Sequence, residues 1–163
     1  MKAKRITKLA LLTTIALIIY TVEAQIPVPV PIYGVKLGLA NIITVYAAFT
    51  MLPGEAVLIL FCRILLGGIF TGRILAMLYS LGGGLLCIAV TLLMVKVLTL
   101  RQMWVASIIG AIFHNVGQLI VAALVMKTLA VFVYAPALLI SGIITGAFTG
   151  FAAQALTNRL DKK

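Results

Sequence analysis

Six long apolar blocks, separated by short polar joints, run through this chain of 163 residues. Hydrophobic residues make up 64% of the sequence and charged residues only 10%, whereas an ordinary soluble chain is about 25% charged. A soluble domain of this size could not hide so much apolar surface from water, so the sequence predicts that lipid surrounds the chain. Each polar group kept inside a membrane is costly, and such groups are the candidates for function.

The apolar blocks predict a bundle of membrane-spanning helices. A helix that crosses a bilayer needs about 20 mainly apolar residues, with about 17 as the lower limit. The predicted spans are residues 6–22, 35–53, 55–72, 74–97, 104–126 and 130–156. Because the joints between them are short, neighbouring helices should pack antiparallel. We therefore expect an all-α integral membrane protein, a single domain over residues 1–163 with six transmembrane helices.

The basic residues indicate how this bundle is oriented. Six spans place both termini on one side of the membrane, and if that side is the cytoplasm, nine Lys and Arg residues lie inside and three at outer ends. The inner set is Lys2, Lys4, Arg5, Lys8, Lys96, Arg101, Arg159, Lys162 and Lys163, and the outer set is Lys36, Arg73 and Lys127. This asymmetry follows the positive-inside rule and predicts a multi-pass protein of the cytoplasmic membrane with both termini inside. Since the basic residues flank the spans, we expect no nucleic-acid partner.

The first apolar block also fits a second interpretation. Residues 1–8 are basic, residues 9–20 form a short apolar stretch, and the sequence Val-Glu-Ala at 22–24 resembles a signal-peptidase site. Cleavage there would leave five spans and place the new amino terminus outside. The family resemblance described below favours the uncleaved form, which we expect.

The scarcity of acidic residues argues against catalysis by this chain alone. Glu23, Glu55 and Asp161 are its three acids, and the predicted topology puts the two glutamates on opposite sides of the membrane. Magnesium-dependent prenyl or phosphoryl transfer uses carboxylates to hold the metal against phosphates. One histidine and two separated cysteines offer no better metal site. We therefore expect no catalytic residues, no metal and no cofactor.

The remaining polar residues of interest fall mainly in the outer half of the predicted bundle. The predicted ligand-binding residues are Glu23, Lys36, Asn41, Arg63, Arg73, His114, Asn115 and Gln118. On a helix His114 and Gln118 are one turn apart and share a face, whereas Asn115 lies about 100° away. Three cations against one outer acid favour an anionic ligand, to which arginine can make a planar bidentate contact.

Each of these residues also has a purely structural interpretation. Polar side chains in membrane helices commonly form interhelical hydrogen bonds, worth about 0.6 kcal/mol each. Arg63 can serve as a partner for Glu23 or extend toward the headgroups, and in either case it needs a fixed acceptor. A lone interior histidine such as His114 is more typical of a satisfied hydrogen-bonding group than of a proton relay.

Small residues mark positions where helices can approach closely. Gly142, Gly146 and Gly150 recur every four residues on the sixth predicted span, and Ala10 and Thr14 form a similar pair on the first. We predict that these positions pack against partner helices, and that the pair on the first span serves a partner subunit.

Several strings of the sequence resemble one family. Residues 23–27 (Glu-Ala-Gln-Ile-Pro) and 34–41, which end in Lys-Leu-Gly-Leu-Ala-Asn, resemble the start of the Gx transporter family, often labelled heptaprenyl diphosphate synthase component I. Residues 63–66 and the stretch 110–119, which contains His-Asn-Val-Gly-Gln, match the same pattern. The matches extend from about residue 6 to residue 156, nearly the whole chain.

This resemblance implies a fold and a role. The family is similar to the substrate-binding S components of energy-coupling factor vitamin transporters, six-helix proteins with cytoplasmic termini that hold a ligand near the outer face. S components dock a transmembrane coupling subunit, which works with ATPases, through an Ala-xxx-Ala motif on the first helix, and here the second alanine position is Thr14. The implied role is that of a substrate-binding subunit of an uptake transporter. Its ligand is expected to be small and anionic, or related to a vitamin or isoprenoid.

A role from a different class remains open. The chain could instead be a non-catalytic accessory membrane protein for prenyl diphosphate or menaquinone metabolism, or for membrane electron transfer. It would then act through protein contacts, and the synthase label would reflect gene association. Genes for coupling ATPases beside this one would favour transport, and a gene for a prenyl synthase would favour the accessory role.

Overall fold

The computed structural model describes residues 2–26 and 38–160, and every regular element in these ranges is helical. The long helices are α1 (Lys2–Glu23), α3 (Pro53–Thr71), α4 (Ile74–Val95), α5 (Met103–Met126) and α6 (Ala135–Leu160), and the short one is α2 (Asn41–Thr50). Two 3-10 turns, η1 (Leu100–Gln102) and η2 (Leu129–Tyr134), lead into α5 and α6.

Five stretches of the described chain are long and apolar enough to cross a membrane. They are Ala3–Glu23, Pro53–Thr71, Ile74–Val95, Leu100–Met126 and Leu129–Leu160. Large apolar side chains such as Ile69, Leu124 and Ile144 are exposed on them, which suits helices whose outer faces contact lipid. The prediction of an all-helical, multi-pass membrane bundle is confirmed to this extent.

The prediction of a membrane-spanning helix over residues 35–53 is wrong about the length of the helix. Residues 35–37 lie outside the described part of the chain, and α2 contains only ten residues. At 1.5 Å per residue α2 is about 15 Å long, half the thickness of the hydrocarbon core. Gly38, with a φ of 80°, belongs to the turn before it, and Met51 after it is extended. Apolar composition alone cannot distinguish a short buried helix from a spanning one.

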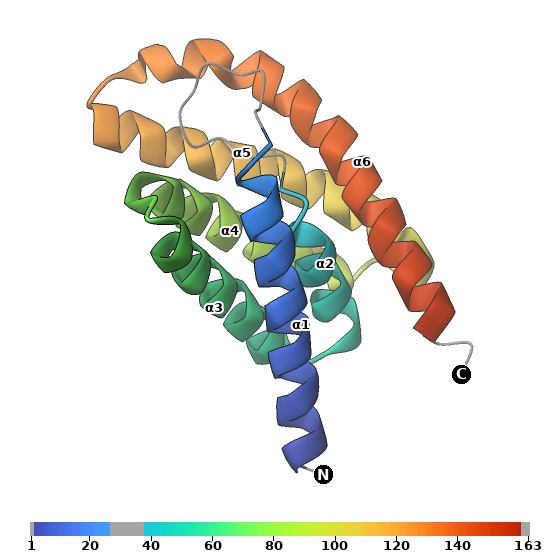
Figure 1. The fold of residues 1–163 in the computed structure, drawn as a ribbon. Coiled ribbons are helices and arrows are strands. Elements are labelled where there is room, and N and C mark those ends of the chain that lie inside the picture. Colours follow the sequence, from blue (N-terminus) through green and yellow to red (C-terminus); the bar gives the residue numbers. More distant parts are fainter. Residues whose placement is uncertain (1, 27–37, 161–163) are drawn as a thin grey trace.

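The short helix α2 lies at the centre of the bundle. It contacts each of the five long helices, and Figure 1 shows it beside α1 with the other helices around it. Its buried residues are Asn41, Ile43, Thr44, Val45, Tyr46, Ala47 and Ala48. The helix α2 is about half as long as its neighbours, and its first residue, Asn41, is buried among them.

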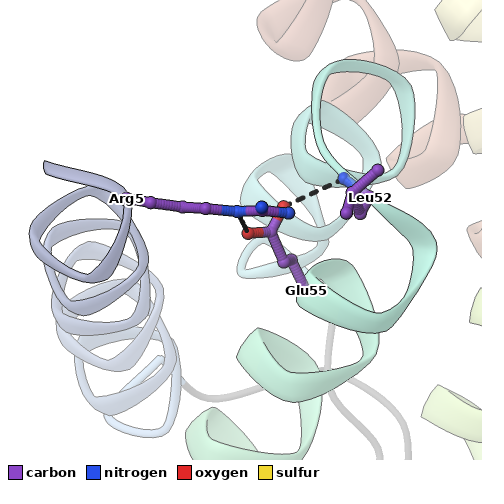
Figure 2. Close-up of polar contacts among 3 residues, drawn as sticks. All are labelled: Arg5, Leu52 and Glu55. Atoms are coloured by element: carbon purple, nitrogen blue, oxygen red, sulfur yellow. Dashed lines mark hydrogen bonds and ion pairs between the residues drawn. The ribbon is translucent and has the colours of Figure 1, made fainter. Parts of the chain in front are cut away.

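The helices α1 and α3 run in the same direction, and contacts at both ends hold them together. At one end Arg5 Nε pairs with Glu55 Oε1, while the other carboxylate oxygen of Glu55 accepts the N–H of Leu52 at 3.0 Å (Figure 2). At the other end Arg73 Nη1 donates to the carbonyl of Ala24 at 3.1 Å. The helices α1 and α3 are therefore parallel, with both amino-terminal ends at the Arg5–Glu55 pair.

The helices α3 to α6 follow one another as antiparallel neighbours, so both ends of the described chain lie at the same end of the bundle (Figure 1). Near that end the N–H of Met103 at the start of α5 donates to Gln154 Oε1 near the end of α6, at 3.3 Å. The Arg5–Glu55 pair lies at this end as well, whereas Glu23 ends α1 about 27 Å away along the helix axis. The two glutamates are thus at opposite ends of α1.

Glycines allow α6 to approach α5 closely. A Cβ on Gly146 would lie 2.7 Å from Ile108 Cα, and a Cβ on Gly150 would lie 2.5 Å from Trp104 Cα. A Cβ on Gly142 would lie 2.7 Å from an amide nitrogen of α5. The glycine stripe predicted to pack on a partner helix therefore faces α5 of the same chain.

Candidate functional site

A small polar cavity lies beyond the first turn of α2. All five helices α1 to α5, together with the turn before α2, contribute to its lining, which consists of Tyr20, Glu23, Gly38, Asn41, Arg63, Ser80 and His114. The cavity has a volume of about 10 Å³, the space for about one water molecule. It lies next to Asn41, the first residue of the short helix α2.

Arg63, in the middle of α3, is buried in the wall of this cavity. Its side chain is only 3% exposed, and its Nη2 donates to Asn41 Oδ1 at 3.3 Å. The guanidinium carbon lies 5.9 Å from the centre of the Tyr20 ring, within the range of a cation–π contact. Its Nε has no hydrogen-bond partner among the described residues. Part of the donor capacity of this guanidinium is therefore uncommitted.

Glu23 supplies negative charge near Arg63. It is 2% exposed, its Oε1 accepts the backbone N–H of Gly38, and its carboxylate acts electrostatically on the guanidinium. A buried cation inside a membrane needs such compensation. The structural interpretation of Arg63, a partner for Glu23, is thus supported. It is compatible with ligand binding, because the two groups still border a cavity.

His114 reaches the cavity from α5. It is 6% exposed, and its Nδ1 has no partner in the described structure. A Cβ on Gly83 would lie 3.0 Å from His114 Cε1, so a glycine in α4 leaves room for the imidazole. An imidazole with an unpaired ring nitrogen therefore belongs to the same lining as the guanidinium with an unpaired Nε.

The other two polar residues predicted on α5 do not line the cavity. Asn115 donates from its Nδ2 to the carbonyl of Leu138 on α6, so it forms an interhelical hydrogen bond. It points to α6 because one residue step turns it about 100° from His114. Gln118 is buried against Gly83 of α4, outside the lining of the cavity.

The rest of the predicted set lies elsewhere. Arg73 is exposed at the start of α4, where it donates to the carbonyl of Ala24 as described above. Lys36 lies outside the described residues. Ala10 and Thr14 are exposed on α1, and the hydroxyl of Thr14 donates to the carbonyl of Ala10 at 2.9 Å. Among the described residues, Arg63 is therefore the only one of the predicted cations that lines the cavity. The negative charge of Glu23 in the same lining balances its positive charge.

Three residues of the lining, Tyr20, Gly38 and Ser80, were missed by the sequence analysis. Tyr20 precedes Glu23 by three residues and shares its helix face, so its position was open to prediction from spacing. Ser80 shares a face of α4 with Gly83 and Gly84 in the same way. The contribution of Gly38 depends on a backbone N–H, which no side-chain pattern reveals.

The cavity offers recognition groups rather than an evident metal site. Its lining combines a guanidinium, an imidazole, a carboxylate, an amide and hydroxyl groups, which suit hydrogen bonding to a polar molecule. Within residues 2–26 and 38–160, no three His, Cys, Asp or Glu side chains come close enough together to hold a metal ion.

We predict that Glu23→Gln destabilises the protein more than the double variant Glu23→Gln/Arg63→Gln does. The single variant leaves the buried Arg63 without its compensating charge, a loss of about 3–5 kcal/mol when one partner of a buried pair is removed. The double variant removes both charges together. Melting temperatures in detergent measure the difference, and a double variant less stable than the single one would contradict the compensation.

The family of the chain follows from a comparison with protein-family models. The model described as heptaprenyl diphosphate synthase component I matches residues 12–156, a range that contains every residue of the cavity lining. No curated protein and no solved structure gave a significant match. The match confirms the resemblance that the motifs indicated. This chain therefore belongs to the heptaprenyl diphosphate synthase component I family.

Proposed function

We propose that this chain is the membrane-embedded substrate-binding subunit of a small-molecule uptake transporter, with a role similar to that of energy-coupling factor S components. The observation that carries the proposal is the polar cavity, whose lining residues Arg63 and His114 each keep a buried nitrogen without a partner among the described residues. Unpaired polar groups inside a membrane bundle lower its stability. A ligand that accepts and donates hydrogen bonds at this cavity accounts for their presence.

The position of the cavity supports uptake from outside the cell. Exposed basic residues gather at the end of the bundle that holds both termini, namely Lys4, Arg5, Lys8, Lys96, Arg101 and Arg159. The positive-inside rule places that end of the bundle on the cytoplasmic side of the membrane. The cavity lies near Glu23, at the opposite end of α1, which then faces the side from which an imported molecule arrives.

The charges of the lining narrow the ligand chemistry. Arg63 suits a carboxylate, phosphate or carbonyl oxygen. Glu23 lies in the same lining and reduces the attraction for a highly charged anion. We therefore favour a small molecule with one acidic or carbonyl group over a diphosphate. Because the cavity has room for only about one water molecule, its walls must move apart before a larger ligand can bind.

The family description favours a second candidate, a subunit for prenyl diphosphate metabolism, which we propose to be non-catalytic. In this role the chain acts through a protein partner, such as a prenyl synthase. In both candidate functions we propose that the chain has no prenyltransferase activity of its own, since the two glutamates are separated by the length of α1.

We predict that the purified protein carries a small molecule that mass spectrometry identifies after extraction. Glu23→Gln/Arg63→Gln should retain less than about a tenth of it, because losing a charge-assisted contact weakens binding by about 1.5–3 kcal/mol. The matched control Arg73→Gln alters an exposed arginine outside the cavity and should retain the wild-type amount. Equal retention by the wild-type protein and the double variant would contradict a binding site at Arg63.

We predict that both termini face the cytoplasm. Single cysteines at residues 2 and 162, introduced in a background without Cys62 and Cys87, should react with a membrane-impermeant maleimide in inside-out vesicles only. A cysteine introduced at Lys127, at the other end of α5, should react in right-side-out vesicles. Labelling of either terminus from outside would reverse the orientation of the cavity.

We predict that the purified protein, given an allylic diphosphate, isopentenyl diphosphate and magnesium, forms no elongated prenyl product. The physical reason is that Glu23 and Glu55, the two acids among the described residues, lie at opposite ends of α1 and cannot share a magnesium ion. Chromatography of radiolabelled products measures the outcome, with a known prenyl synthase as the positive control. Chain elongation by this protein alone would show that it is an enzyme.

A further inference from the structure

The side-chain amide of Gln118 is buried between α4 and α5 without a hydrogen-bond partner. The residue is 2% exposed, and neither Nε2 nor Oε1 is bonded in the described structure. An amide left unpaired inside a protein lowers its stability, and each such group in a native structure calls for an explanation. The nearby Asn115 on the same helix is bonded to the carbonyl of Leu138, so α5 carries one paired and one unpaired buried amide.

The helix that faces Gln118 explains why no side chain pairs with it. A Cβ on Gly83 would lie 3.0 Å from Gln118 Cγ, so the opposing residue is a glycine with no polar side chain. No backbone group of α4 is bonded to the Gln118 amide in the described structure. One turn further along α5, Ala122 belongs to an apolar cluster with Tyr79 and Val131. The described structure therefore leaves both polar atoms of this amide without a partner.

Gln118 also lies next to the cavity. His114, one turn earlier on the same face of α5, lines the cavity and has an unpaired Nδ1. In the antiparallel packing of α4 on α5, Gly83 meets both His114 and Gln118. Ser80, about one turn nearer the start of α4 than Gly83, lines the cavity as well. Gln118 thus packs against the same glycine as His114, one helical turn from a residue of the cavity lining.

We propose that Gln118 is a second recognition point of the candidate binding site, and that the ligand presents to it a cis-amide edge such as that of a lactam or cyclic imide. A primary amide places a donor beside an acceptor, which matches an N–H beside a C=O. A carboxylate or phosphate offers acceptors only and would leave Gln118 Oε1 unpaired. The proposal rests on the proposed binding function and adds a ligand class, a heterocyclic amide whose acceptor group reaches Arg63.

The two amides of α5 provide a matched stability test. In protein washed free of small molecules, Gln118→Leu should raise the melting temperature by about 2 °C or more, because it removes an unpaired buried amide. Asn115→Leu should lower the melting temperature, because it breaks the bond to the carbonyl of Leu138. A fall for Gln118→Leu comparable to that for Asn115→Leu would overturn the proposal, since the Gln118 amide would then be structural.

Two fragment probes test the ligand class. At millimolar concentration 2-pyridone, which carries a cis-amide edge, should raise the melting temperature of the wild-type protein, whereas N-methyl-2-pyridone, which lacks the N–H, should not. Gln118→Leu should lose this response, and Asn115→Leu should keep it. Equal responses of the wild-type protein to both probes, or a response that survives in Gln118→Leu, would overturn the assignment of an amide edge.

Retention of the co-purified small molecule separates this proposal from the binding function itself. We expect both Glu23→Gln/Arg63→Gln and Gln118→Leu to lose it. If only the charge-balanced double variant loses it, the binding function stands and the contact with Gln118 is wrong. If both variants retain the wild-type amount, the binding function is wrong, and the second proposal fails with it.

Discussion

A ten-residue helix at the centre of the bundle is the constraint on which the other features of this structure depend. The helix α2 contacts all five long helices, yet it covers only about half of the hydrocarbon thickness. Among the described residues, side chains from four of these helices surround a cavity next to Asn41, the first residue of α2. Tyr20, Glu23, Arg63, Ser80 and His114 reach into this space, and together they form the polar cavity.

The polar groups of the bundle divide into paired and unpaired sets. Between α5 and α6, Asn115 donates to a backbone carbonyl, and the hydroxyls of Ser107 and Thr149 lie 2.9 Å apart, so this interface is satisfied internally. On the other face of α5, toward α4 and the cavity, His114 and Gln118 have atoms without partners among the described residues. Hydrogen bonds in a medium of low dielectric stabilise the interface between α5 and α6. The interface between α5 and α4 contains polar atoms whose hydrogen bonds a ligand can supply.

The family description and the residue chemistry are compatible when the chain is a binding subunit. The description names a component of a synthase, and the family match covers the cavity and nearly all of the bundle. Prenyl transfer needs clustered carboxylates. Here Glu23 ends α1, whereas Glu55, on α3, pairs with Arg5 near the start of α1. A balanced pair, Arg63 and Glu23, beside an imidazole is better suited to holding a polar molecule than to activating a diphosphate.

The sequence alone determined the membrane class, five of the spanning helices and the family, because long apolar runs and short motifs are local properties. It also singled out Glu23, Asn41, Arg63 and His114, since polar groups stand out in an apolar sequence. Tertiary structure decided that α2 is short, because an apolar segment is equally suited to lipid and to a protein interior. It also decided which neighbour each side chain meets. Asn115 finds a carbonyl and Gln118 finds a glycine, and that difference depends on how α4 and α6 pack against α5.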